Sequence, residues 1–74
     1  MKRWMQLYLR TRAEWQRDTR GWEAIELNGM AAHWEREGDA VRGGTGVLAR
    51  RCDRLAEMYR MKAEITGAIG RGER

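Results

Sequence analysis

The chain has 74 residues and a formal net charge of +4, from 15 lysines and arginines against 11 aspartates and glutamates, and it contains no proline. A chain of this length is expected to form one small domain, residues 1–74, with a modest core. Its one cysteine, Cys52, excludes an intrachain disulfide, and Cys52 with His33 is too few for a four-ligand zinc site. We therefore expect added stability from a second copy of the chain or from a partner protein.

Charged and polar residues interrupt every apolar stretch. The chain starts Met1-Lys2-Arg3-Trp4, and Gln6 and Arg10 follow closely, which is not the pattern of a signal peptide. No segment approaches the roughly 18 uninterrupted apolar residues that a membrane-spanning helix needs. We expect a cytoplasmic protein without a membrane partner.

The first expected element is a long helix over about residues 2–37, a segment rich in good helix formers. Tyr8, Trp15 and Trp22 recur every seven residues, and Trp4 occupies a neighbouring position. On a helix this spacing places the aromatic rings along one face.

The apolar positions of this segment change face after Ile25. At about 100° per residue, the later apolar positions lie about a quarter turn away from the aromatic face. These later positions are Leu27, Met30, Ala31 and Trp34. A break or kink near Gly21 or at the turn-forming pair 28–29 would explain the change. One alternative is a three-helix chain with a short middle helix near residues 30–37. We favour the continuous helix.

Glycines then mark a loop over residues 38–46 and a tail over about 67–74, which we expect to be frayed. Between them, residues 46–66 are predicted to form an amphipathic helix, with Thr45 as its N-cap. Its apolar face has the 3-and-4 spacing of a helix and comprises Leu48, Cys52, Leu55, Met58, Tyr59, Ile65 and Ile69. The predicted fold is thus an all-α, two-helix antiparallel hairpin, completed by self-association into a helical bundle.

No segment predicts catalysis or cofactor binding. Residues 44–49 spell G-x-G-x-x-A, but the dinucleotide-binding loop with this pattern needs a preceding strand, and none is predicted here. His33 lacks a neighbouring nucleophile motif, and Cys52 lies on an apolar helix face. We expect no enzyme activity, cofactor, metal or small-molecule substrate.

Four tryptophans without any phenylalanine are unusual in so short a chain. Tryptophan and arginine are enriched in binding hot spots, although the rings could equally fill the core. Two short helices carry more large apolar surface, in more directions, than one hairpin can bury. The residues expected at a protein interface are Trp4, Tyr8, Trp15, Trp22, Leu27, Met30, Trp34, Leu48, Leu55 and Tyr59. We predict a protein-interaction or assembly module that binds itself, a larger protein, or both, as an adaptor, structural subunit or inhibitor.

The alternative function is nucleic-acid binding through arginine-rich helix faces. The candidate contacts are Arg3, Arg10, Arg17, Arg50, Arg51 and Arg54. Carboxylates of Glu14, Asp18, Asp53 and Glu57 lie beside them in the sequence, which weighs against a dedicated phosphate-binding face.

Residues 46–59, from Gly46-Val47-Leu48 to Glu57-Met58-Tyr59, resemble a helix of the small terminase subunits of tailed phages. Those proteins are helical oligomers that recognise viral DNA, so the resemblance implies a phage packaging or regulatory role under the nucleic-acid alternative. It covers less than a quarter of the chain and consists of common helix-forming residues, and it does not assign the chain to that family.

Overall fold

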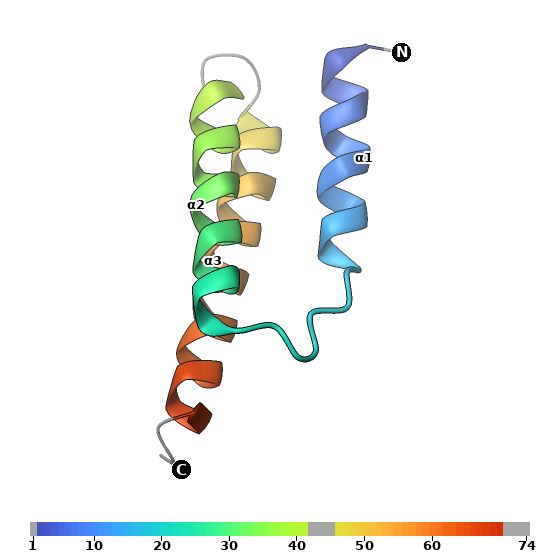
Figure 1. Ribbon diagram of the computed structural model, residues 1–74. Helices are drawn as coiled ribbons and strands as arrows, with labels where there is room; N and C mark the ends of the chain where they lie inside the picture. Colours follow the sequence, from blue (N-terminus) through green and yellow to red (C-terminus); the bar gives the residue numbers. More distant parts are fainter. Residues whose placement is uncertain (1, 42–45, 71–74) are drawn as a thin grey trace.

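Three α-helices make up the computed structural model, which describes residues 2–41 and 46–70. Helix α1 comprises Arg3–Trp15, α2 comprises Ala24–Val41, and α3 comprises Gly46–Gly70. Helices α2 and α3 lie side by side as an antiparallel hairpin, and α1 runs parallel to α3 along the side of that hairpin (Figure 1). Helix α3 continues beyond the level at which α1 ends (Figure 1).

The all-α prediction is confirmed for the described residues, but the prediction of two helices is wrong. The segment expected to form one helix over about residues 2–37 is two helices joined by residues 16–23. The less favoured three-helix alternative is closer, although its middle helix begins at Ala24 and not near residue 30. The break falls near Gly21, whereas Asn28 and Gly29 lie within α2.

The core of the hairpin comes from one face of α2 and one face of α3. Helix α2 buries Leu27, Ala31, Trp34 and Gly38, at spacings of four, three and four residues. Helix α3 buries Leu48, Cys52, Leu55 and Tyr59 at the same spacings, with Ala49, Ala56 and Ala63 also buried. These spacings bring successive side chains onto one helix face, and the small residues let two helices approach closely.

The linker between α1 and α2 turns at Gly21. Its φ angle of +84° is in the left-handed region, where glycine has no side chain to strain the backbone. The Trp22 amide donates to the Thr19 carbonyl oxygen at 3.1 Å across this turn. The carboxylate of Glu26 then accepts a hydrogen bond from the Glu23 amide, satisfying one of the free donors at the start of α2.

The boundaries of the other elements also differ from prediction. Helix α2 continues to Val41, so Gly38 lies in a helix and not in the expected loop over 38–46. Helix α3 continues to Gly70, four residues past the predicted end at 66. Thr45, the predicted N-cap, and residues 71–74 of the predicted tail lie outside the described residues.

Gly38 lies at a point of α2 where α3 leaves little room for a side chain. A Cβ atom at this position would lie 3.2 Å from the Cys52 Cβ and 3.2 Å from an Asp53 carboxylate oxygen. At Gly29, in the same helix, a Cβ would meet no atom within 4 Å. The two glycines therefore have similar helical backbones, but Gly38 is closely packed and Gly29 faces open space.

We expect Gly29→Ala to stabilise the fold by about 0.5–1 kcal/mol, because alanine is the better helix former and its methyl group meets open space. Gly38→Ala should instead destabilise it by about 1 kcal/mol, because overpacking against α3 exceeds the same propensity gain. Urea denaturation followed by circular dichroism measures both. Equal stabilisation by the two substitutions would contradict the close packing at Gly38.

None of the three described helices combines the length and apolar character needed to cross a membrane.

Candidate interaction surface on helices α1 and α3

Glu14 is a buried carboxylate where all three helices meet. Its residue exposure is only 4%, in a helix whose other buried residues are Leu7 and Thr11. Glu14 Oε1 accepts hydrogen bonds from the Tyr59 hydroxyl of α3 at 2.8 Å and from the Trp34 indole N–H of α2 at 3.3 Å. One carboxylate thus joins α1 to both helices of the hairpin.

Arg17 and Trp22 close this polar junction on the linker side. The Arg17 guanidinium lies 3.1 Å from Glu14 Oε2 and 5.6 Å from the centre of the Trp22 ring. Trp22 stacks on Tyr59, with ring centres 6.3 Å apart. Burial raises the pKa of the Tyr59 hydroxyl above its ordinary value, and its hydrogen bond to the Glu14 carboxylate raises this pKa further.

A second polar junction joins α1 to α3 one helical turn earlier. The buried Thr11 hydroxyl donates to the Tyr8 carbonyl oxygen at 2.7 Å and accepts from Arg51 Nε at 3.0 Å. The Arg51 guanidinium also lies 4.3 Å from the centre of the Tyr8 ring, a cation–π distance. Helix α1 is therefore held by polar and cation–π contacts, with Leu7 as its one apolar residue in the buried core.

Two shallow hollows lie beside these junctions, and Trp15 and Arg54 line both of them. Together they form one continuous surface, which we call the α1–α3 face. Its apolar centre consists of Trp15, Met58, Met61 and Ile65, and around it lie Arg12, Arg51, Arg54, Glu57 and Lys62. Trp15 is 55% exposed, Met61 63% and Ile65 58%.

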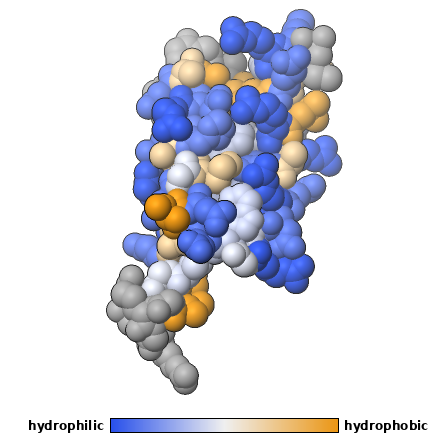
Figure 2. All heavy atoms as spheres, viewed as in Figure 1, coloured by the Kyte–Doolittle hydropathy of each residue, from blue (hydrophilic) through white to orange (hydrophobic). Residues whose placement is uncertain are grey.

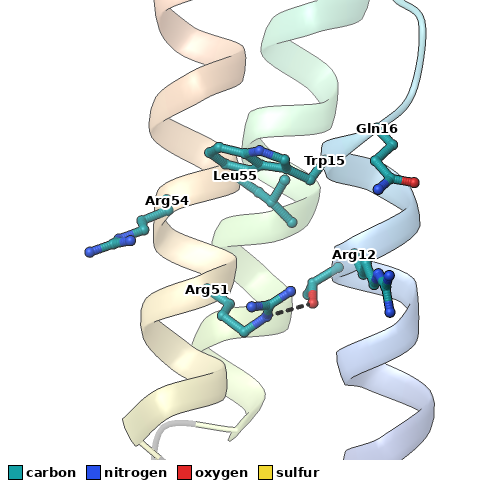
Figure 3. Close-up of a pocket in the computed structure, with 7 residues that line it drawn as sticks. Arg12, Trp15, Gln16, Arg51, Arg54 and Leu55 are labelled. Atoms are coloured by element: carbon teal, nitrogen blue, oxygen red, sulfur yellow. Dashed lines mark hydrogen bonds between the residues drawn. The ribbon is translucent and has the colours of Figure 1, made fainter.

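Figure 3 shows the first of these hollows. The Trp15 ring reaches from α1 across to α3 beside Leu55, while Arg51 points back toward α1 and bonds to the hydroxyl that lines the hollow (Figure 3). Arg54 points outward from the far side of α3 (Figure 3). Figure 2 shows hydrophobic side chains over the outer edge of α1 and the lower part of α3, within a largely hydrophilic surface.

The residues predicted for a protein interface separate into two groups. The buried core of this chain contains Leu27, Trp34, Leu48, Leu55 and Tyr59, and partly buried Trp22 and Met30 pack against it. Trp4, Tyr8 and Trp15 are exposed on α1. The first group thus packs within the molecule, and only the second is open to a partner.

The apolar face predicted for the last helix also divides. Leu48, Cys52, Leu55 and Tyr59 are buried and Met58 is partly buried, but Ile65 and Ile69 are exposed, which corrects their assignment to that face. Ile65 instead lines the hollow beside Trp15, together with Met58 and Met61.

Of the six arginines proposed for nucleic-acid binding, three are engaged within the molecule. Arg10 pairs with Glu37 at 3.4 Å and lies 5.6 Å from the Trp34 ring centre, and Arg17 and Arg51 take part in the two polar junctions. Arg3, Arg50 and Arg54 are exposed. Three of the six arginines therefore have partners within the molecule, although Arg10 and Arg17 are exposed as well.

His33 and Cys52, the residues considered for catalysis or metal binding, pack within the molecule. His33 Nε2 lies 3.8 Å from a Glu37 carboxylate oxygen, and its ring meets the Trp34 ring edge-on. Cys52 is fully buried, and burial raises the pKa of its thiol. In residues 2–41 and 46–70, no three His, Cys, Asp or Glu side chains gather as metal ligands would.

Sequence reasoning missed Glu14 as a structural residue and Met61 as a surface residue. Helical spacing could have indicated both positions. Glu14 lies on the same face of α1 as Leu7 and Thr11, and Met61 lies three residues after Met58 on a second face of α3. No family model matches the chain, and neither a curated protein nor a solved structure matches it.

Proposed function

We propose that this chain is a protein-interaction module that binds a larger protein through the α1–α3 face, as an adaptor, structural subunit or inhibitor. The observation that carries the proposal is the continuous surface on which Trp15, Met61 and Ile65 stay more than half exposed after the helices have packed. Isolated exposed apolar residues are ordinary, but contiguous ones bordered by polar residues are typical of interaction sites.

The residue types on this surface support the same function. Tryptophan, methionine and arginine are enriched at protein interfaces relative to other protein surface. Here Trp15 stands between Met58 and Met61 on one side and Arg12 and Arg51 on the other, in the two hollows that it lines. An aromatic anchor beside arginines is a common composition for a binding hot spot.

The position of α1 bears on the expected self-association. In the two-helix hypothesis, a second copy was needed to cover the α2–α3 hairpin. In the structure α1 covers part of that hairpin, since Leu7 lies in its core and Glu14 bonds to both of its helices. We therefore propose a different protein, and not a second copy, as the partner.

The test is retention of host proteins by the immobilised chain. The double substitution Met61→Ser with Ile65→Ser should lower retention of a specific partner about tenfold or more, because it removes two apolar contacts. Ile25→Ser is the matched control, since Ile25 is 76% exposed on α2 and lies outside the face. Retention is measured by quantitative mass spectrometry, with circular dichroism showing that each variant stays folded.

A partner retained equally by all three proteins would show that binding, if specific, uses another surface. Loss of retention with Ile25→Ser as well would point to general stickiness of exposed apolar residues.

A further inference from the structure

The α1–α3 face carries a strong positive surplus. Four basic residues, Arg12, Arg51, Arg54 and Lys62, line its two hollows, against one carboxylate, that of Glu57. Arg51 and Lys62 are held in place by hydrogen bonds to hydroxyl groups, those of Thr11 at 3.0 Å and Thr19 at 3.1 Å. Those bonds neutralise no charge, but the Arg51 guanidinium also lies over the Tyr8 ring, and the hydrogen bonds of Arg20 and, to a lesser extent, the charge of Lys62 lower the pKa of the Asp18 carboxyl. The exposed Arg12 and Arg54 are therefore the basic side chains best placed to attract an acidic partner.

The same charges oppose a second copy of this chain on the face. A symmetric dimer pairs the same surface with itself, so eight basic side chains would come together with only two carboxylates, those of the two Glu57 residues. Juxtaposed like charges weaken such an interface. A partner with acidic residues around an apolar centre would instead be attracted by the same basic side chains.

The apolar centre has the geometry of a helix-binding surface. On α3, Met58, Met61 and Ile65 follow one another at spacings of three and four residues, the repeat by which helices pack along each other, and Arg54 borders this row one turn before Met58. Trp15 stands at one end of this row, where α1 stops, and α3 continues past it (Figure 1). A row of this kind fits the apolar face of another helix laid alongside α3.

Nucleic acid fits the row less well. Phosphates bind to basic side chains along a groove, and unpaired bases stack on several aromatic rings. The row past Trp15 offers Met58, Met61 and Ile65 instead, which make neither contact.

We propose that the α1–α3 face binds an amphipathic helix whose apolar stripe is bordered by aspartate and glutamate residues. This inference rests on the proposed function and specifies the chemistry of its partner. The apolar stripe packs against Met58, Met61 and Ile65 beside Trp15, while the acidic border meets Arg12 and Arg54. This is helix-in-groove recognition with electrostatic selection.

The experiment uses a displayed library of random helical peptides, selected on the full chain and counter-selected on the double variant Met61→Ser/Ile65→Ser. We expect the recovered peptides to have apolar residues at 3-and-4 spacing and a net negative charge. Synthesised singly, they should bind about tenfold more weakly to the double variant and about fivefold more weakly to Arg54→Glu. Arg36→Glu, at an exposed position of α2, and Ile25→Ser should change binding by less than about twofold.

The outcomes separate this inference from the proposed function. Recovery of neutral or basic peptides that still need Met61 and Ile65 would overturn the acidic partner and leave the interaction surface standing. Absence of any enrichment over the double variant would overturn the helical partner, and the retention of host proteins described above would then decide by itself whether the face binds a protein. Displacement of the peptides by short duplex DNA at physiological salt, or a dimer in sedimentation that the double variant abolishes, would replace the acidic helix by nucleic acid or by a second copy.

Discussion

Glu14→Ala is expected to lower the free energy of unfolding by about 3 kcal/mol, because it leaves the buried Tyr59 hydroxyl and Trp34 indole N–H without their acceptor and Arg17 without its ion-pair partner. That is a large part of the roughly 4–11 kcal/mol that a domain of this size holds. Urea denaturation followed by circular dichroism measures it.

Two controls separate the junction from a general effect of losing a carboxylate. Glu14→Gln keeps a carbonyl oxygen that can accept from both donors, so it should cost only about 1 kcal/mol. Glu64→Ala, at an exposed position of α3, should change stability by less than about 0.5 kcal/mol. If Glu14→Ala costs no more than Glu64→Ala, the polar junction does not stabilise the fold.

The same substitution should act mainly on α1. That helix buries only Leu7, Thr11 and Glu14, whereas α2 and α3 share the rest of the core. Elements with few buried apolar contacts open before the rest of a domain. Amide hydrogen exchange in Glu14→Ala should therefore quicken more in residues 3–15 than in α2 and α3, and uniform quickening would contradict this order.

Alkaline solution should destabilise the protein through Tyr59, which is fully buried. Burial and the Glu14 carboxylate raise the pKa of its hydroxyl in the folded state above the ordinary value of 10.0, so the folded chain keeps a proton that the unfolded chain loses. The stabilisation is complete below pH 10 and is lost as pH rises toward the folded-state pKa. The expected slope is about 1.4 kcal/mol per pH unit above pH 10.

Tyr59→Phe isolates this contribution from other groups that titrate at high pH. At neutral pH the variant should be less stable by about 1 kcal/mol, because it no longer donates to Glu14. Above pH 10 its stability should fall less steeply than that of the natural chain, so that the two curves converge. Parallel curves between pH 10 and pH 12 would show that the Tyr59 hydroxyl ionises as readily in the folded as in the unfolded state.

The last helix is the element most fully predicted from sequence. Its start at residue 46 and its buried row of Leu48, Cys52, Leu55 and Tyr59 follow from local spacing. Spacing alone also assigned Ile65 and Ile69 to that row, although both are exposed. Ala63, in the same turn of α3 as Ile65, is buried, so Ile65 is exposed because it belongs to the neighbouring row with Met58 and Met61. Steps of three and four residues do not by themselves separate two neighbouring faces of one helix.

The sequence narrowed the break between α1 and α2 to two positions but did not decide between them. Gly21 and the pair 28–29 were both plausible, and the structure breaks the helix over residues 16–23 while it keeps Asn28 and Gly29 helical. An asparagine–glycine pair favours a turn locally, but here the burial of Leu27, Ala31 and Trp34 against α3 holds the helix through it. Tertiary packing outweighed the local preference at that site.

The sequence by itself determined an all-helical chain and a surplus of large apolar and basic side chains, because helix formation and composition depend on local residue types. Only the tertiary structure decided which of those side chains form the core. Trp34 and Tyr59 are buried with their polar atoms bonded to Glu14 of α1, whereas Trp15 is left exposed beside Met61 and Ile65 where α1 stops. That outcome depends on contacts between residues 20 and 45 positions apart, which no local pattern contains.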